Sequence, residues 1–255
     1  MPAPEGIWTQ IELQGHACDV YEPPQFLSGP SSEPRKAIIY LHGVRLALLA
    51  DYPAFTNEFA RHGLAVLAPH TGPSWWTDRI TPGFDARITP VRHVLDNVLP
   101  YAAERWGIRP PQIGLLGTSM GGQGALRLAF KHADTFPVVA AIAPAIDYQI
   151  RWREGDEVLR AIYEDAETVR QDTATLHIHP LHWPRHTWVC CDPADDRWHE
   201  SADRLRMKLG ALGIPHEADL STSAGGHGWE YYQHMAPRAV GFLAERLERE
   251  RLRVV

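Results

Sequence analysis

The segment that most constrains the fold of this chain is Gly117-Thr118-Ser119-Met120-Gly121, a glycine-x-serine-x-glycine motif. An apolar run at 113–116 precedes it, and a helix-forming run at 122–130 follows it. This context predicts a strand, a very sharp turn and a helix, with glycines where a side chain would collide with its surroundings. Such a turn holds the serine hydroxyl above the edge of a sheet, as in a nucleophile elbow.

Strands and helices are expected to alternate along most of the chain. Apolar runs at 37–41, 64–68, 112–116 and 136–143 are typical of parallel strands buried on both faces. We predict an α/β fold with a mostly parallel central sheet and helices on both faces. Further strands are expected at 7–13, 17–21, 187–191 and 216–220, and helices at 51–62, 89–106, 122–130, 155–173, 199–212 and 229–253.

The 255 residues are expected to form a single domain, 1–255, because that length suits one large core. The stretch 23–34 is rich in proline and serine and is expected to be a loop. Two irregular or polar segments, 70–87 and 150–186, are candidates for a lid or cap over the site.

Composition excludes several classes of partner. The net charge is −6 and no Lys/Arg run is present, which argues against nucleic acid. No apolar stretch approaches the roughly 18 residues of a membrane span, and the first residues lack the pattern of a secretory signal. Three cysteines, two of them adjacent, favour a reducing compartment, so we expect a cytoplasmic protein. The sequence does not indicate the oligomeric state.

A serine nucleophile needs a histidine base and a carboxylate, which follow it along the chain in this architecture. His227 is the predicted base, because it lies in a glycine-rich loop (225–228) between the last strand and the last helix. His216 and His234 fall inside regular elements instead. The histidines at 177–186 precede the strand that should deliver the acid, and no acidic or cysteine pattern completes a metal site there, so we expect no metal.

The acid is expected just after the strand 187–191. Asp192, Asp195 and Asp196 all follow that strand, and one of them could instead cap the next helix. Asp147, after the strand 136–143, is an outside candidate. The residues alone do not choose among the three aspartates.

An oxyanion hole needs two backbone N–H donors. We expect them at Met120, directly after the nucleophile, and at Val44, in the loop after the strand 37–41. His42, Trp75, Trp76 and Trp229 are expected to contribute to substrate binding, although the two adjacent tryptophans could equally pack the segment onto the core.

Together these residues resemble the α/β-hydrolase superfamily and, within it, the esterase D-type esterases, which include feruloyl esterases and S-formylglutathione hydrolases. The resemblance runs from His42-Gly43 to Gly226-His227 and is strongest over 117–126. It favours Asp196 as the acid, because related esterases place theirs shortly before a helix start like that at 199–201. Thr118 and Gln123 stand where S-formylglutathione hydrolases usually carry histidines, which favours an ordinary ester over a glutathione thioester.

The resemblance implies a serine hydrolase that cleaves small-molecule carboxylic esters through an acyl-enzyme and needs no cofactor. Ser119, His227 and Asp196 would form its catalytic triad. A thioesterase, an acyltransferase or a peptidase would use the same residues. A binding module that retains the fold without catalysis is the alternative of another class.

Overall fold

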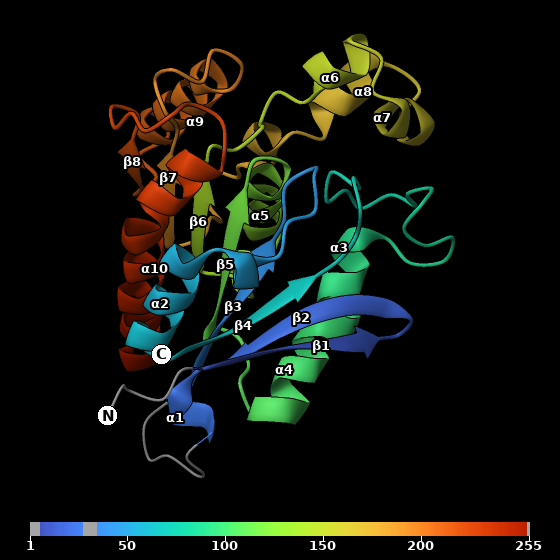
Figure 1. Ribbon diagram of the computed structural model, residues 1–255. Coiled ribbons are helices and arrows are strands. Elements are labelled where there is room, and N and C mark those ends of the chain that lie inside the picture. Colours follow the sequence, from blue (N-terminus) through green and yellow to red (C-terminus); the bar gives the residue numbers. More distant parts are fainter. Residues whose placement is uncertain (1–5, 28–34, 254–255) are drawn as a thin grey trace.

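The computed structural model describes residues 6–27 and 35–253 (Figure 1). Most of the expected loop at 23–34, and the first five residues of the chain, lie outside the described part. The described part of that loop forms a short helix, α1 (Pro24–Leu27).

An eight-stranded sheet forms the centre of the molecule, in the order β1-β2-β4-β3-β5-β6-β7-β8. The first three strands in this order pair antiparallel, and the rest pair parallel. Every residue of β4, β5 and β6 is buried, as expected for strands covered on both faces. The predicted α/β class is therefore confirmed. The strands are β1 (Ile7–Leu13), β2 (His16–Glu22), β3 (Lys36–Leu41), β4 (Leu64–Pro69), β5 (Ile113–Thr118), β6 (Val138–Ile142), β7 (His186–Cys190) and β8 (Glu217–Asp219).

Helices cover both faces of this sheet (Figure 1). On one face α2 (Pro53–His62) packs against the long terminal helix α10 (Trp229–Leu252). On the other side lies a continuous helical stretch of α3 (Pro90–His93), η2 (Val94–Val98) and α4 (Leu99–Trp106), in which η2 is a π-helical turn. The remaining helices of the body are η1 (Leu49–Asp51), α5 (Met120–Lys131) and α9 (His199–Ala211). None of the described helices is long and apolar enough to cross a membrane.

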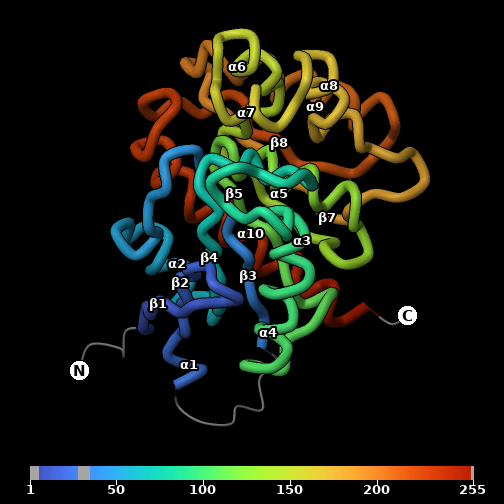
Figure 2. The backbone as a smooth tube through the Cα atoms, turned by 90° about the vertical axis from the view of Figure 1, so that its right-hand side faces the viewer, coloured from blue at the N-terminus to red at the C-terminus, as the bar shows by residue number. Residues whose placement is uncertain are grey.

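The single helix expected at 155–173 is broken in two, α7 (Glu157–Ile162) and α8 (Ala166–Gln171). Asp165 causes the break: its backbone is extended, and its side chain accepts a hydrogen bond from the Thr168 N–H at 2.7 Å. Such N-capping requires a non-helical backbone at the capping residue, so the preceding helix must end first. With α6 (Gln149–Arg153) and η3 (Ala174–His177), these pieces lie at the end of the molecule opposite α1 (Figure 2).

Candidate active site

The turn between β5 and α5 has the geometry that its glycines predict. Ser119 lies at φ 54° and ψ −118°, in the left-handed half of the backbone map. A Cβ atom on Gly117 would lie 2.1 Å from the Gly121 carbonyl oxygen, and one on Gly121 would lie 1.8 Å from the Leu41 carbonyl oxygen. Any residue larger than glycine would therefore push the turn out of place. The expected elbow is present at Ser119.

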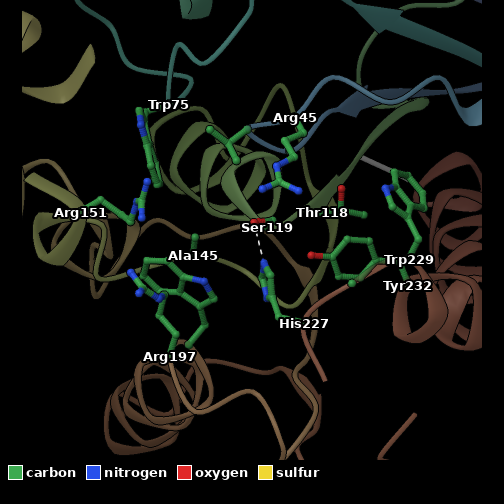
Figure 3. Close-up of a pocket in the computed structure, with 14 residues that line it drawn as sticks. Arg45, Trp75, Thr118, Ser119, Ala145, Arg151, Arg197, His227, Trp229 and Tyr232 are labelled. Atoms are coloured by element: carbon green, nitrogen blue, oxygen red, sulfur yellow. Dashed lines mark hydrogen bonds between the residues drawn. The ribbon is translucent and has the colours of Figure 1, made fainter. Parts of the chain in front are cut away.

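Three side chains from three loops form one hydrogen-bonded series. The Ser119 Oγ lies 2.9 Å from the His227 Nε2 (Figure 3), and the His227 Nδ1 lies 2.6 Å from the Asp195 Oδ2. A carboxylate beside Nδ1 favours the tautomer that carries its proton there, which leaves Nε2 free to accept the serine proton. Such a series can activate a serine hydroxyl as a nucleophile.

Asp195, and not Asp196, contacts the histidine, so the expectation for Asp196 does not agree with the structure. Asp195 is buried, and its second carboxylate oxygen accepts a hydrogen bond from the Trp198 N–H at 3.1 Å. The chain turns here, with the Asp195 N–H donating to the Asp192 carbonyl at 2.9 Å. Asp196 is exposed and has no hydrogen-bond or ion-pair partner among the described residues. Asp147, the outside candidate, is paired with Arg204.

Asp192 holds the loop that carries His227. Its side chain is fully buried and accepts four hydrogen bonds, most of them from backbone N–H groups. Burial alone would raise the pKa of this carboxyl, but the hydrogen bonds outweigh it and lower the pKa to about 2. The donors are the N–H of Ala194 (2.8 Å), the Ser223 Oγ (2.8 Å), the N–H of Ala224 (2.6 Å) and the N–H of Gly226 (2.9 Å).

Of the two expected oxyanion donors, Val44 lines the cleft, and Met120 directly follows the nucleophile at the start of α5. Met120 is the first residue of α5, so its N–H has no partner within the helix. Val44 follows Gly43 in the loop after β3, and both line the cleft beside Ser119. A Cβ atom on Gly43 would lie only 3.6 Å from the Ser119 Cβ, so this loop packs directly against the elbow.

His42 lies behind the cleft, which corrects the expectation that it binds substrate. Its ring is buried between two backbone groups: Nδ1 donates to the Gly43 carbonyl at 2.7 Å, and Nε2 accepts from the Thr71 N–H at 3.1 Å. Burial lowers the pKa of His42 to about 4, so the ring is neutral at physiological pH. A neutral ring can serve both backbone groups at once, which fixes the loop that carries Val44.

The expected tryptophans separate into two roles. Trp75 and Trp229 line the cleft, and Trp229 stacks on Tyr52 with ring centroids 3.6 Å apart. Trp76 is buried outside the cleft lining, and its Nε1 donates to the His42 carbonyl at 3.1 Å. Trp76 therefore packs and orients the loop, so the expectation that it binds substrate is not supported.

The cleft above Ser119 has a volume of about 550 Å³ (Figure 3). Sequence reasoning missed several of its lining side chains, because they lie in segments that carry no motif. Tyr232 is one of them: its hydroxyl points toward Ser119 (Figure 3), and burial raises its pKa, so the phenol stays protonated. The other missed side chains are those of Arg45, Ala145, Arg151, Arg197 and Trp198.

Three of the four histidines at 177–186 pair with separate carboxylates, and the fourth, His179, accepts a hydrogen bond from the Leu181 N–H at 3.1 Å. The His177 Nε2 lies 3.0 Å from Asp172, and the His182 Nε2 lies 3.1 Å from Asp134. Among the residues that the structure describes, no three His, Cys, Asp or Glu side chains are grouped as metal ligands would be.

The sheet order, the elbow and the site above it define an α/β-hydrolase fold. The putative esterase family model matches residues 17–243, so the chain belongs to that family. The family implies small-molecule ester substrates. Among curated protein sequences, no match to this chain was found.

Solved structures of esterases share the fold. An S-formylglutathione hydrolase from Agrobacterium tumefaciens matches with a TM-score of 0.77 and 17% identity, over 95% of this chain and 94% of that one. A ferulic acid esterase matches with a TM-score of 0.75 and 17% identity, over 95% and 98%. The fluorophosphonate-binding serine hydrolase F of Staphylococcus aureus matches with a TM-score of 0.71 and 16% identity, over 94% and 99%.

Proposed function

We propose that this chain is a serine carboxylesterase that hydrolyses small esters through an acyl-enzyme intermediate. The observation that carries the proposal is the unbroken series Ser119–His227–Asp195 at the base of an open cleft. Membership of the putative esterase family supports the same reaction class.

In the first half of the reaction, the Ser119 Oγ attacks the ester carbonyl carbon while the His227 Nε2 takes its proton. Asp195 holds the imidazole and stabilises the positive charge that it gains. The carbonyl oxygen becomes an oxyanion, which the N–H groups of Met120 and Val44 stabilise. His227 then gives its proton to the leaving alcohol as the carbon–oxygen bond breaks, and the acyl group stays on Ser119.

In the second half, water enters the cleft and His227 removes a proton from it as it attacks the acyl carbon. The second tetrahedral intermediate collapses, the proton returns to the Ser119 Oγ, and the carboxylic acid leaves. Side chains and backbone groups of this chain supply every step. The same series would serve a thioester, so a matched thioester belongs in the substrate panel.

The proposal is tested with p-nitrophenyl acetate and p-nitrophenyl butyrate, hydrolysed by the wild type and by Ser119→Ala. We expect turnover by the wild type and a loss of about 10³-fold or more in kcat in the variant. A fluorophosphonate probe should label the wild type and not the variant. Equal turnover by the two proteins, or no labelling of the wild type, would contradict the proposal.

A further inference from the structure

The acidic and basic side chains differ in where they lie: arginines line the cleft, although the whole chain is negative. Three arginines, Arg45, Arg151 and Arg197, line the cleft, and no aspartate or glutamate is among the described lining residues. The chain as a whole has a net charge of −6. The three arginines reach the cleft from different elements: Arg45 from the loop after β3, Arg151 from α6, and Arg197 from the loop before α9 (Figure 3).

Two of these arginines are already paired at the rim. The Glu154 Oε2 lies 3.3 Å from Arg151 and 2.6 Å from Arg197, and Asp156 lies 3.5 Å from Arg151. These contacts join α6 to the loop before α9, and they leave the pair of guanidinium groups close to neutral overall. Arg151 and Arg197 therefore shape this side of the cleft more than they charge it.

Arg45 is different, because no acidic group lies within ion-pair distance of it in residues 6–27 and 35–253. Its side chain is exposed, and its guanidinium is turned toward the middle of the pocket from the side opposite His227 (Figure 3). It directly follows Val44, whose position His42 fixes through Gly43. A guanidinium is charged at every physiological pH and binds a carboxylate through two parallel N–H···O bonds.

We propose that Arg45 binds a carboxylate group of the substrate, so that the preferred substrates are small esters bearing one free carboxylate. This inference rests on the proposed esterase function and names its substrate class. One unpaired cation matches a single negative charge. The rings of Trp75, Trp198 and Trp229 line the cleft and suit the apolar remainder of the substrate.

The test compares two matched pairs of esters. Mono-p-nitrophenyl glutarate against p-nitrophenyl valerate places the charge on the acyl side, and 3-acetoxybenzoate against phenyl acetate places it on the alcohol side. In at least one pair, we expect the ratio of kcat/KM, charged over neutral, to fall about tenfold in Arg45→Gln and to recover partly in Arg45→Lys. Added NaCl should lower that ratio in the wild type.

Arg61→Gln is the matched control, because it removes one exposed positive charge on α2, outside the cleft. It should leave both ratios unchanged. If Arg45→Gln and the wild type have the same kcat/KM ratios for both pairs of esters, the inference about Arg45 is overturned. Hydrolysis of the neutral esters would still support the esterase function in that case.

Calorimetric titration with hexanoate and hexanamide measures the binding of a carboxylate by Arg45 without any ester cleavage. Tighter binding of hexanoate by the wild type, lost in Arg45→Gln, supports it even if no ester in the panel is cleaved. Equal binding of the two compounds by the wild type, or no binding of either, overturns it.

Discussion

The two segments that deliver the nucleophile and the acid are built by opposite means. Around Ser119, backbone packs on backbone: the Cβ positions of Gly117 and Gly121 are filled by carbonyl groups. Around Asp195, side chains bind backbone: Asp192 and Asp195, three residues apart, accept hydrogen bonds from the chain around them. The first segment tolerates no change in shape, whereas the second depends on the charge of particular carboxylates.

This difference explains why one segment has a motif and the other does not. A steric requirement can be met only by glycine, so it is visible in the sequence. A carboxylate can be supplied by any of several neighbouring aspartates, and the backbone turn decides which one faces inward. Variants of the two segments should therefore lose activity for different reasons: steric collision at the elbow, and loss of a carboxylate near Asp195.

Asp195→Asn should lower kcat by about 10³ to 10⁴-fold with little change in the fold. An amide in this place can hold His227 in the wrong tautomer, because it can donate a hydrogen bond to Nδ1. Steady-state kinetics on p-nitrophenyl butyrate measure the loss, and circular dichroism checks the fold. A loss below about tenfold would mean that the acid is not at Asp195.

Gly121→Ala should lower activity by at least about 100-fold and destabilise the protein by about 2 to 4 kcal/mol, because its Cβ would lie 1.8 Å from the Leu41 carbonyl oxygen. Urea unfolding and the same kinetic assay measure both effects. Gly210→Ala in α9 is the control, since the nearest atom to its Cβ is 3.9 Å away and alanine favours a helix. If Gly121→Ala behaves like Gly210→Ala, the steric account of the elbow fails.

Asp192→Asn should destabilise the protein by about 2 kcal/mol and slow hydrolysis about tenfold, because the loop carrying His227 loses its anionic acceptor. The folded-state pKa of Asp192 is lowered from 3.8 to about 2. The stabilisation is therefore complete above about pH 4 and is lost as the pH falls from about 4 to about 2.

Urea unfolding at several pH values tests whether the stability that Asp192 contributes falls as the pH is lowered. The difference in stability between the wild type and Asp192→Asn should be constant from pH 7 to about pH 5 and should shrink toward pH 3. A difference that grows as the pH falls would show that the carboxylate destabilises the folded state.

Asp196→Asn should change kcat/KM by no more than about twofold and stability by less than about 0.5 kcal/mol, because the residue is exposed and unpaired among the described residues. It is the neighbour control for Asp195→Asn, with the same chemical change one residue away. A large loss of activity in Asp196→Asn, with Asp195→Asn nearly as active as the wild type, would identify Asp196 as the acid of the triad.

Most of the fold could be predicted from sequence, because buried parallel strands are apolar throughout and the helices between them are periodic. Ser119 and His227 were predicted from glycines and chain order, and the structure brings them together at 2.9 Å. The prediction of one helix over 155–173 was wrong. The segment is helical in composition, but Asp165 adopts an extended backbone and caps a second helix.

The other wrong predictions for the site residues have a shared cause, which is that they depend on the local course of the backbone. Whether Asp195 or Asp196 faces the histidine depends on one turn of backbone, and the resemblance to related esterases was one residue off. His42 and Trp76 carry the right chemistry for binding, but they are used against backbone groups of the same loop. Arg45 and Tyr232 lie in no motif, and only the fold brings them to the cleft. The cytoplasmic location stays a prediction.

The backbone of Ser119 has an evolutionary consequence. A residue other than glycine at φ 54° and ψ −118° costs about 1 to 3 kcal/mol, so folding alone would favour glycine at this position. Mutational drift in a chain selected only for its shape would therefore tend to replace the serine, and the replacement would make the protein more stable. A serine at a backbone conformation that favours glycine is what selection for chemistry at this position would produce.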